Sequence, residues 1–394
     1  MPSGGARFED RVVISGIGQS GIGRRLGRSP LALTLDAITA ALDDAGLAPA
    51  DVGGLASYPG GGTALGPGFA GPAIRDVYDA LGLEVDVLLG NFEGPAQLGP
   101  VLTGCLAISA GLVRHVVVYR TVTEGSARRD ATDADVATDP DEWSRRWITP
   151  FGGGPAVLAF GLLARRHFHE YGTSREQLAQ IALTARRHAQ LNPNAIYRDP
   201  MTLSDYLAAR MIADPLCLFD CDVHCDGSTA LVLSDADYAP DAPSRVVRID
   251  AIGGAPPLRS DYAQHVDVLP GRRAADQMWN RTDIRPPQID VASLYDGFSI
   301  LTMLWLEALG FCGVGESGPF VEDGTRISLA GELPVNPNGG QLSGGRLHGL
   351  GFVHEMCLQL RGKAGARQVP TARVAVVAVG ALPYVGCMLL RADS

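Results

Sequence analysis

Strand-like and helix-like segments alternate along this chain, and the alternation occurs twice. In the first half, a β-branched strand at residues 11–16 precedes a helix that starts at Pro30. A glycine-rich loop is expected at residues 52–75 and a second apolar strand at residues 116–119. In the second half, a strand at residues 246–253 precedes a helix at residues 272–282, and two hydrophobic strands joined by a tight turn end the chain. This pattern predicts an α/β fold with helices covering a parallel or mixed sheet, built from a duplicated unit.

The first helix carries clear start and stop signals. Ser29 can cap its N-terminus, Pro30 suits its first turn and Gly46 ends it, with apolar residues between them at helical spacing. The glycines at residues 16–21 upstream spell GxGxxG. Because eight residues separate them from Pro30, they do not open the helix that a dinucleotide pyrophosphate requires, and we expect no nicotinamide cofactor.

A glycine-rich stretch occupies residues 334–351, between strand-like residues 321–330 and helix-like residues 354–362. Six glycines, two asparagines and two prolines cannot build a side-chain core. Such a loop either connects two elements or brings backbone close to a ligand, and we favour the ligand. Its polar groups are Asn336, Asn338, Ser343, Arg346 and His348.

The middle of the chain changes character. An acidic stretch at residues 126–146 is expected to run over the surface or over a partner subunit, and three helices follow within residues 154–212. Asp226 and Gly227 then predict a turn before another apolar strand. His224 and Asp226 beside this turn are assigned structural roles in preference to catalytic ones.

Composition excludes several classes of function. The chain has 394 residues, is 46% hydrophobic and 19% charged, and has a net charge of −10 with a pI near 5.3, which opposes nucleic-acid binding. No apolar run reaches membrane-spanning length and the N-terminus has no secretory signal, so we expect a cytoplasmic protein with no membrane association. The seven cysteines fit reduced thiols, and the series Cys217, Cys221, Cys225 does not complete a zinc site, so no metal is expected.

Several segments together resemble the thiolase superfamily. They are the opening VVISGIGQSGIGRRLGRSPLALTLDAITAALDDAGLAPADVGGL, the central EYGTSREQLAQIALTARRHAQLNPNA and ADPLCLFDCDVHCDGSTALVLSD, and the late ELPVNPNGGQLSGG. The resemblance is greatest to the sterol-carrier-protein-x or lipid-transfer type. It implies a five-layered αβαβα fold of two similar halves, residues 1–240 and 241–394, with a helical loop region inserted at about 120–215, and a homodimer.

The chain departs from thiolases at the positions of their chemistry. The thiolase nucleophile is a cysteine at the start of the buried helix of the first half, and the matching position falls near Gly94 in NFEGPAQ, which has no cysteine. Cys105 further along is interpreted as a core thiol. Where thiolases have GHPxG this chain has GRLHG, which places Arg346 at the histidine position and His348 two residues on. The HDCF-type segment reads LYDGF, which puts Tyr295 in place of its histidine.

A missing nucleophile with a Tyr-Asp pair and an HG turn resembles the thiolase-like steroid side-chain aldolases of bacterial sterol catabolism. The resemblance implies retro-aldol cleavage of a hydroxylated steroid side-chain CoA thioester to a 17-ketosteroid and a short acyl-CoA such as propionyl-CoA. Tyr295 would act as base and His348 or loop amides would stabilise the enolate. Arg346 stands where this branch commonly has a second tyrosine, and a permanently charged guanidinium suits an enolate or phosphate better than proton transfer.

The other expected contacts are to the CoA thioester, with no cofactor bound by the chain itself. The residues assigned to substrate or CoA binding are Asp296, Asn338, Gly339, Gly340, Ser343, Gly94 and Asp226. Asn91 and Glu93 are weaker candidates for the pocket. The implied partner is a small zinc-ribbon/OB-fold protein, fused to or associated with an enoyl-CoA hydratase.

Two further functions stay open. One is a catalytically silent thiolase-like subunit that binds acyl-CoA, and the less favoured one is an acetyl-CoA acetyltransferase. Structural roles also stay open: Tyr295 could pack inward to close a turn, Asp296 could cap the helix that follows it, and His354 could be a satisfied polar residue on its helix.

Overall fold

The computed structural model describes residues 7–60, 66–90, 95–130, 156–255, 270–381 and 384–393. Its strands are β1 (Val12–Gln19), β2 (Gly54–Ser57), β3 (Val87–Gly90), β4 (His115–Thr123), β5 (Met211–Ala213), β6 (Leu216–Cys217), β7 (Asp226–Asp235), β8 (Val247–Ala255), β9 (Val291–Leu294), β10 (Val374–Ala381) and β11 (Tyr384–Ala392). Its α-helices are α1 (Pro30–Ala45), α2 (Ile74–Leu81), α3 (Gly99–Ser109), α4 (Glu124–Asp130), α6 (Ala156–Tyr171), α7 (Arg175–Ala189), α8 (Leu203–Ala208), α9 (Pro270–Trp279), α10 (Ser299–Leu309), α11 (Ser317–Val321) and α12 (Leu350–Leu360).

Nine strands form one mixed sheet in the order β3-β2-β4-β7-β1-β8-β11-β10-β9. The first five in this order belong to the first half of the chain and the last four to the second half. The halves join where β1 pairs antiparallel with β8, at Val13 with Arg248 and Ile14 with Val247. A separate antiparallel pair, β5 and β6, lies outside this sheet.

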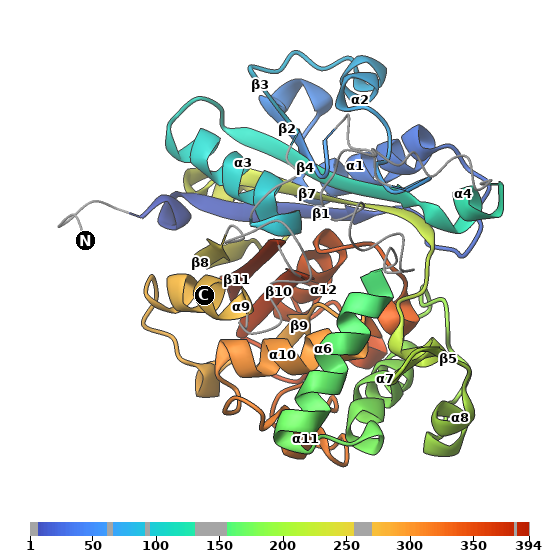
Figure 1. Cartoon of the computed structure of the whole chain (residues 1–394). Coiled ribbons are helices and arrows are strands. Elements are labelled where there is room, and N and C mark those ends of the chain that lie inside the picture. The colour runs from blue at the N-terminus through green and yellow to red at the C-terminus, as the bar shows by residue number, and fades with distance from the viewer. Residues whose placement is uncertain are drawn as a thin grey trace, which may run out of the picture.

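Helices cover both halves and fill the space between them (Figure 1). The outer face of the first half is covered by α1, which packs on β1, β7 and β4, and the outer face of the second half by α9, which packs on β8 and β11. Between the halves, α3 packs on β4 and β7, whereas α12 contacts β7 of the first half and β9 and β10 of the second. The layers are therefore α, β, α, β, α, and the predicted five-layered fold is confirmed.

The first helix and its glycines behave as local rules predict. The Ser29 side chain accepts a hydrogen bond from the backbone N–H of Ala32, and Gly46 ends α1 with a φ of 69°. A Cβ on Gly16 would lie 2.1 Å from the carbonyl oxygen of Ala41, and one on Gly18 would lie 2.2 Å from that of Ala37. These two glycines allow β1 and α1 to pack closely.

The helices expected in the middle of the chain are α6, α7 and α8. Of these, α7 packs against α10, α11 and the loop that carries the glycine-rich stretch. The acidic stretch predicted at residues 126–146 lies largely outside the described residues, since the structure describes none of residues 131–155.

Three local predictions were wrong. Residues 321–330 form no strand, because the Asp323 carboxylate accepts hydrogen bonds from the N–H and hydroxyl of Thr325 and Gly324 has a φ of 71°, which turns the chain. Asp226 and Gly227 do not form a turn but begin β7, paired with Thr123 and Val122. The loop predicted at residues 52–75 contains the strand β2.

Candidate active site

Tyr295, Arg346 and His348, the three predicted catalytic residues, lie together. Tyr295 follows β9, and its backbone N–H donates to the carbonyl oxygen of Ala378 in β10 over 3.0 Å. Its hydroxyl lies 3.4 Å from Nδ1 of His348. The Nε–H of Arg346 donates to Nε2 of the same imidazole over 3.1 Å. The three side chains therefore form one chain of polar contacts, with His348 in the middle.

The glycine-rich loop takes its shape from Asp296. The carboxylate of Asp296, fully buried, accepts from the backbone N–H groups of Gln341 (2.8 Å) and Leu342 (3.4 Å) in the π-helical turn Gly340–Gly344. A Cβ on Gly340 would lie 1.9 Å from Oδ2 of Asp296. Burial raises the pKa of Asp296 to about 7, against the opposing effect of these hydrogen bonds. Asp296 thus holds the loop and does not cap α10, whose N-cap, Phe298, makes no side-chain cap.

Other predicted binding residues anchor the same loop. Ser343 accepts a hydrogen bond from Nε of Arg186 in α7 over 3.0 Å. The carbonyl oxygen of Asn338 accepts from Nδ2 of Asn192 over 2.9 Å. Gly339 has a φ of 95° and leaves no room for a side chain, since a Cβ there would lie 2.6 Å from that of Ala189. These contacts join the loop to the helical region that precedes β7.

Asp226 has hydrogen-bond partners outside the contacts of Tyr295, Arg346 and His348. It is fully buried in β7 and accepts from the backbone N–H of Leu26 (2.7 Å) and from the N–H (2.9 Å) and hydroxyl (2.5 Å) of Ser126. This geometry agrees with the structural role preferred for Asp226. Gly94, together with Asn91 and Glu93, lies outside the described residues.

The central helix of the first half begins beside the site. The short 3-10 turn η3 (Ala96–Leu98) precedes α3, and Ala96 has a φ of 55°. A Cβ on Gly349, next to His348, would lie 2.6 Å from that of Gln97. Cys105 lies among the buried residues of α3, and burial raises the pKa of its thiol. It is a core thiol, as predicted.

Two acidic residues that sequence reasoning missed complete the cluster. Glu124 begins α4 directly after β4, and its Oε2 lies 3.5 Å from Nε of Arg346 and 3.7 Å from Nε2 of His348. Oδ2 of Asp222 lies 3.2 Å from Nε of Arg346. An acidic residue at the end of an apolar strand, as in VVVYRTVTE, is the sequence signal that could have identified Glu124.

His224, assigned a structural role from the sequence, also contacts this cluster. Its Nε2 lies 2.9 Å from a terminal guanidinium nitrogen of Arg346 and 3.8 Å from Oε1 of Glu124. Its side chain is 27% exposed, more than the others. His224 thus lies at the accessible side of Arg346.

Burial and charge set the protonation states here. Burial first, and then the charges of Arg346 and Arg120, lower the pKa of His348 to about 3, although Glu124 opposes this shift. Burial raises the pKa of the Tyr295 phenol, and the charge of Arg346 partly offsets that rise. Burial alone would raise the pKa of Glu124, but His348 and Arg346 reverse its effect and lower the pKa. The imidazole is therefore neutral and the carboxylate charged at neutral pH.

Aromatic rings form the wall of the site. Phe69 meets the His348 ring edge-on, with centroids 4.8 Å apart. The buried guanidinium of Arg120 lies 4.5 Å from the centroid of Phe69 and 5.3 Å from that of Tyr58. Burial lowers the pKa of Arg120 to about 10. Phe69 and Arg120 therefore place an aromatic ring and a buried cation beside His348.

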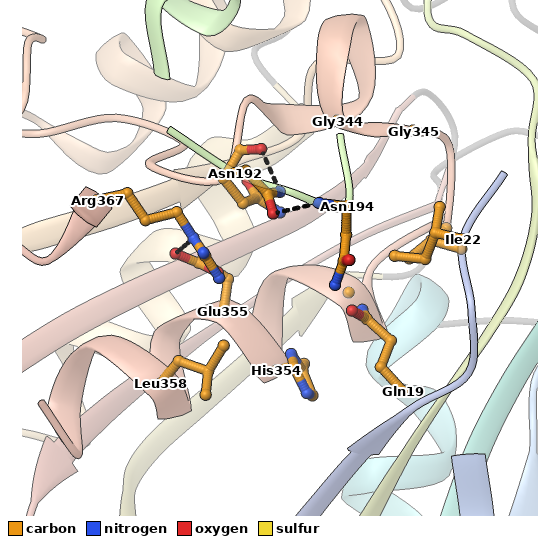
Figure 2. A pocket seen from close by; sticks show the side chains of 13 residues that line it. Gln19, Ile22, Asn192, Asn194, Gly344, Gly345, His354, Glu355, Leu358 and Arg367 are labelled. Carbon is orange, nitrogen blue, oxygen red and sulfur yellow. Dashed lines mark hydrogen bonds and ion pairs between the residues drawn. The ribbon is translucent and has the colours of Figure 1, made fainter. Parts of the chain in front are cut away.

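A polar pocket lies on another side of the glycine-rich loop (Figure 2). It is a cavity of about 60 Å³, and the amide ends of Asn194 and Gln19 face one another across it in Figure 2. His354 lines this pocket and not the Tyr295 cluster, and burial, with Arg367 and Arg361, lowers its pKa to about 4. The pocket has room for a few water molecules.

Within the described ranges, no group of three or more His, Cys, Asp or Glu side chains is arranged to hold a metal ion. No helix in that part of the chain has both the length and the apolar character needed to cross a membrane.

The chain is similar to several known proteins along most of its length. Residues 259–383 match the family model described as thiolase C-terminal domain-like. The chain is 31% identical to the steroid side-chain-cleaving aldolase of Thermomonospora curvata, across 97% of this chain and 98% of that protein. It is 32% identical to the 17-hydroxy-3-oxo-4-pregnene-20-carboxyl-CoA lyase of Mycobacterium tuberculosis, across 96% and 99% of the two chains. The solved Ltp2-ChsH2(DUF35) aldolase superposes with a TM-score of 0.86 at 30% identity, covering 97% of this chain and 98% of that one.

Proposed function

Since this chain belongs to the thiolase-like family that includes these aldolases, we propose that it catalyses retro-aldol cleavage of a hydroxylated steroid side-chain CoA thioester. The products are a 17-ketosteroid and a short acyl-CoA such as propionyl-CoA. The observation that carries the proposal is a pair of contacts, of Tyr295 with His348 and of His348 with Arg346. These contacts include no cysteine that could act as a thiolase nucleophile.

The reaction needs a base, a site for negative charge and a source of one proton. Tyr295, in its phenolate form, takes the proton of the tertiary hydroxyl, the carbon–carbon bond breaks, and the electron pair passes into the thioester enolate as the ketone forms. The charge of Arg346 and the amides of the glycine-rich loop stabilise that enolate. One proton leaves the hydroxyl and one proton is added to the enolate, so the reaction needs no further reactant. It also needs no covalent bond between enzyme and substrate.

The silent acyl-CoA-binding subunit is the second candidate. It is favoured by the pairing of Arg346 with Asp222 at 3.2 Å and by the lack of a tyrosine at position 346, which together leave the proton donor of the aldolase branch without a counterpart. Such a subunit would bind the thioester and would not cleave it.

We also propose a homodimer and a small zinc-ribbon/OB-fold partner. The similar solved structure of an Ltp2-ChsH2(DUF35) aldolase supports a partner of the DUF35 type. The sheet edge formed by β3 supports contact between copies, because Leu88 on this edge strand is 43% exposed.

The test is an assay of the purified chain, alone and with a zinc-ribbon partner, on a 17-hydroxylated steroid side-chain CoA thioester. Mass spectrometry would follow the ketosteroid and the short acyl-CoA. We expect both products from the wild type, and a loss of at least about 100-fold in kcat/KM for Tyr295→Phe. Tyr78→Phe on α2 is the matched control. Cleavage that survives Tyr295→Phe would refute the assignment of the base, and thioester binding without cleavage would favour the silent subunit.

A further inference from the structure

Arg346 and Glu124 compete for the same nitrogen of His348. The Nε–H of Arg346 donates to Nε2 over 3.1 Å, whereas Oε2 of Glu124 lies 3.7 Å from that atom. A neutral imidazole carries one proton, and the hydrogen bond made by one ring nitrogen decides which nitrogen holds it. A donor at Nε2 requires a lone pair there and puts the proton on Nδ1, whereas a carboxylate acceptor requires the proton on Nε2.

We propose that Arg346 is a positioning residue that fixes the Nδ1–H tautomer of His348, so that this N–H donates to the phenol oxygen of Tyr295. This inference rests on the proposed function for its catalytic consequence. It gives arginine a role at a position where it cannot serve as a proton donor.

The surroundings hold Arg346 in the required orientation. Asp222 lies 3.2 Å from its Nε, Glu124 lies 3.5 Å from the same atom, and His224 lies 2.9 Å from a terminal nitrogen. The guanidinium is planar, so contacts at two of its corners set the direction of the Nε–H bond. The side chain is only 20% exposed, which limits competition from water.

Glu124 is itself rigidly placed. A Cβ on Gly125 would lie 1.9 Å from the carbonyl oxygen of Arg24, so the first turn of α4 is pressed against that segment. Asp226 fixes the next residue by accepting both hydrogen bonds of Ser126. Oε2 of Glu124 is buried and, apart from its 3.5 Å ion pair with Nε of Arg346, makes no hydrogen bond among the described residues. It is therefore available to capture Nε2–H if Arg346 releases that nitrogen.

The consequence for the reaction concerns Tyr295. A phenol in a buried site is a poor base unless its anion is stabilised. Burial raises the pKa of the Tyr295 phenol, and against that larger effect an Nδ1–H donor at 3.4 Å and the nearby charge of Arg346 both favour the phenolate. In the opposite tautomer, Nδ1 would accept from the phenol and would favour its protonated form. The tautomer of His348 therefore decides whether Tyr295 can accept the substrate proton.

The experiment is ¹⁵N NMR of histidine-labelled protein, which distinguishes the two tautomers without any substrate. We expect Nδ1–H at His348 in the wild type and Nε2–H in Arg346→Lys, which keeps the charge but loses the planar donor. We also expect kcat of Arg346→Lys to fall about 100-fold with KM within about threefold. The matched control is Arg75→Lys, because the Arg75 side chain on α2 is 76% exposed. This variant should leave the His348 tautomer and kcat unchanged.

Glu124→Gln provides an independent variant if Arg346→Lys does not fold. Removal of the competing carboxylate should keep the Nδ1–H tautomer. An Nε2–H tautomer in the wild type, or the wild-type tautomer in folded Arg346→Lys, would overturn the inference. So would inversion of the tautomer in Glu124→Gln. If the tautomer follows these expectations but no form of the protein cleaves the thioester, the proposed function fails and the positioning of His348 stands.

Discussion

The carboxylate of Asp296 accepts a hydrogen bond from the backbone N–H of Gln341 over 2.8 Å, across 45 residues of sequence. This contact joins the segment that carries Tyr295 to the loop that carries Arg346 and His348. The relative position of the base and the imidazole therefore depends on a fully buried carboxyl group.

The pH dependence of stability follows from this carboxyl group. Its pKa is raised to about 7 by burial, so the folded state binds the proton more tightly than the unfolded state. Its contribution to stability is fully present below the unfolded pKa near 4 and is lost as the pH rises toward 7, by on the order of 4 kcal/mol. We expect Asp296→Asn to remove that fall, as measured by urea unfolding at pH 4.5, 5.5 and 7. Asp79→Asn on α2, 60% exposed, should keep it, and an unchanged profile in Asp296→Asn would contradict the prediction.

Two of the three glycines of GxGxxG, Gly16 and Gly18, serve helix packing in this structure. A Cβ on Gly18 would lie 2.2 Å from the backbone oxygen of Ala37, whereas one on Gly21 would meet nothing within 4 Å. We expect Gly18→Ala to lower the free energy of unfolding by about 3 kcal/mol or more, because backbone must move. Gly21→Ala should change it by less than about 1 kcal/mol. Chemical denaturation of both variants tests this, and equal effects would refute the packing role.

Gly297 leaves space for the ring of Tyr295. A Cβ at this position would lie 2.8 Å from Cε1 of Tyr295. Gly297→Ala should therefore displace the phenol from His348 and reduce kcat by about 10- to 100-fold. The melting temperature should change little if the ring can move. Steady-state kinetics with a thermal melt would check this, and a wild-type kcat would show that the ring position is not critical.

Phe69 keeps water from His348. Its removal in Phe69→Ala should raise the pKa of His348 from about 3 toward its ordinary value, because the largest cause of the depression is burial. The other groups that act on this imidazole are Tyr295, Arg346, Arg120 and Glu124. Protonation at Nε2 would then remove the lone pair that accepts from Arg346 and place a second cation beside that guanidinium within the working pH range, so activity should fall at a higher pH than in the wild type. The measurement is kcat/KM against pH.

Phe69→Leu, which keeps an apolar side chain against the imidazole, is the control for this variant and should retain the wild-type profile. If kcat/KM falls at the same acidic pH in the wild type and in Phe69→Ala, a group other than His348 sets that pH.

Local signals along the chain predicted most of the elements. Ser29, Pro30 and Gly46 place α1 correctly because caps and helix stops depend on residues within one turn. The strand expected at residues 321–330 was wrong because a side-chain turn at Asp323 competes with extended backbone. The short strand β2 was not predicted because the residues of Gly54–Ser57 have a low preference for strands. The strand forms because it pairs with β3 on one side and β4 on the other, and both lie further along the chain.

By itself, the sequence determined the alternation of strands and helices, the loop of six glycines, and the absence of a cysteine from NFEGPAQ. It also singled out Tyr295, Arg346 and His348, although it could not supply their contacts. Only the tertiary structure brought Glu124 and Asp222 to Arg346 and assigned Asp296 and Ser343 to the support of the loop. The physical reason is that caps, turns and periodicity depend on neighbours in the chain, whereas burial and charge pairing depend on atoms that meet only after distant segments have packed.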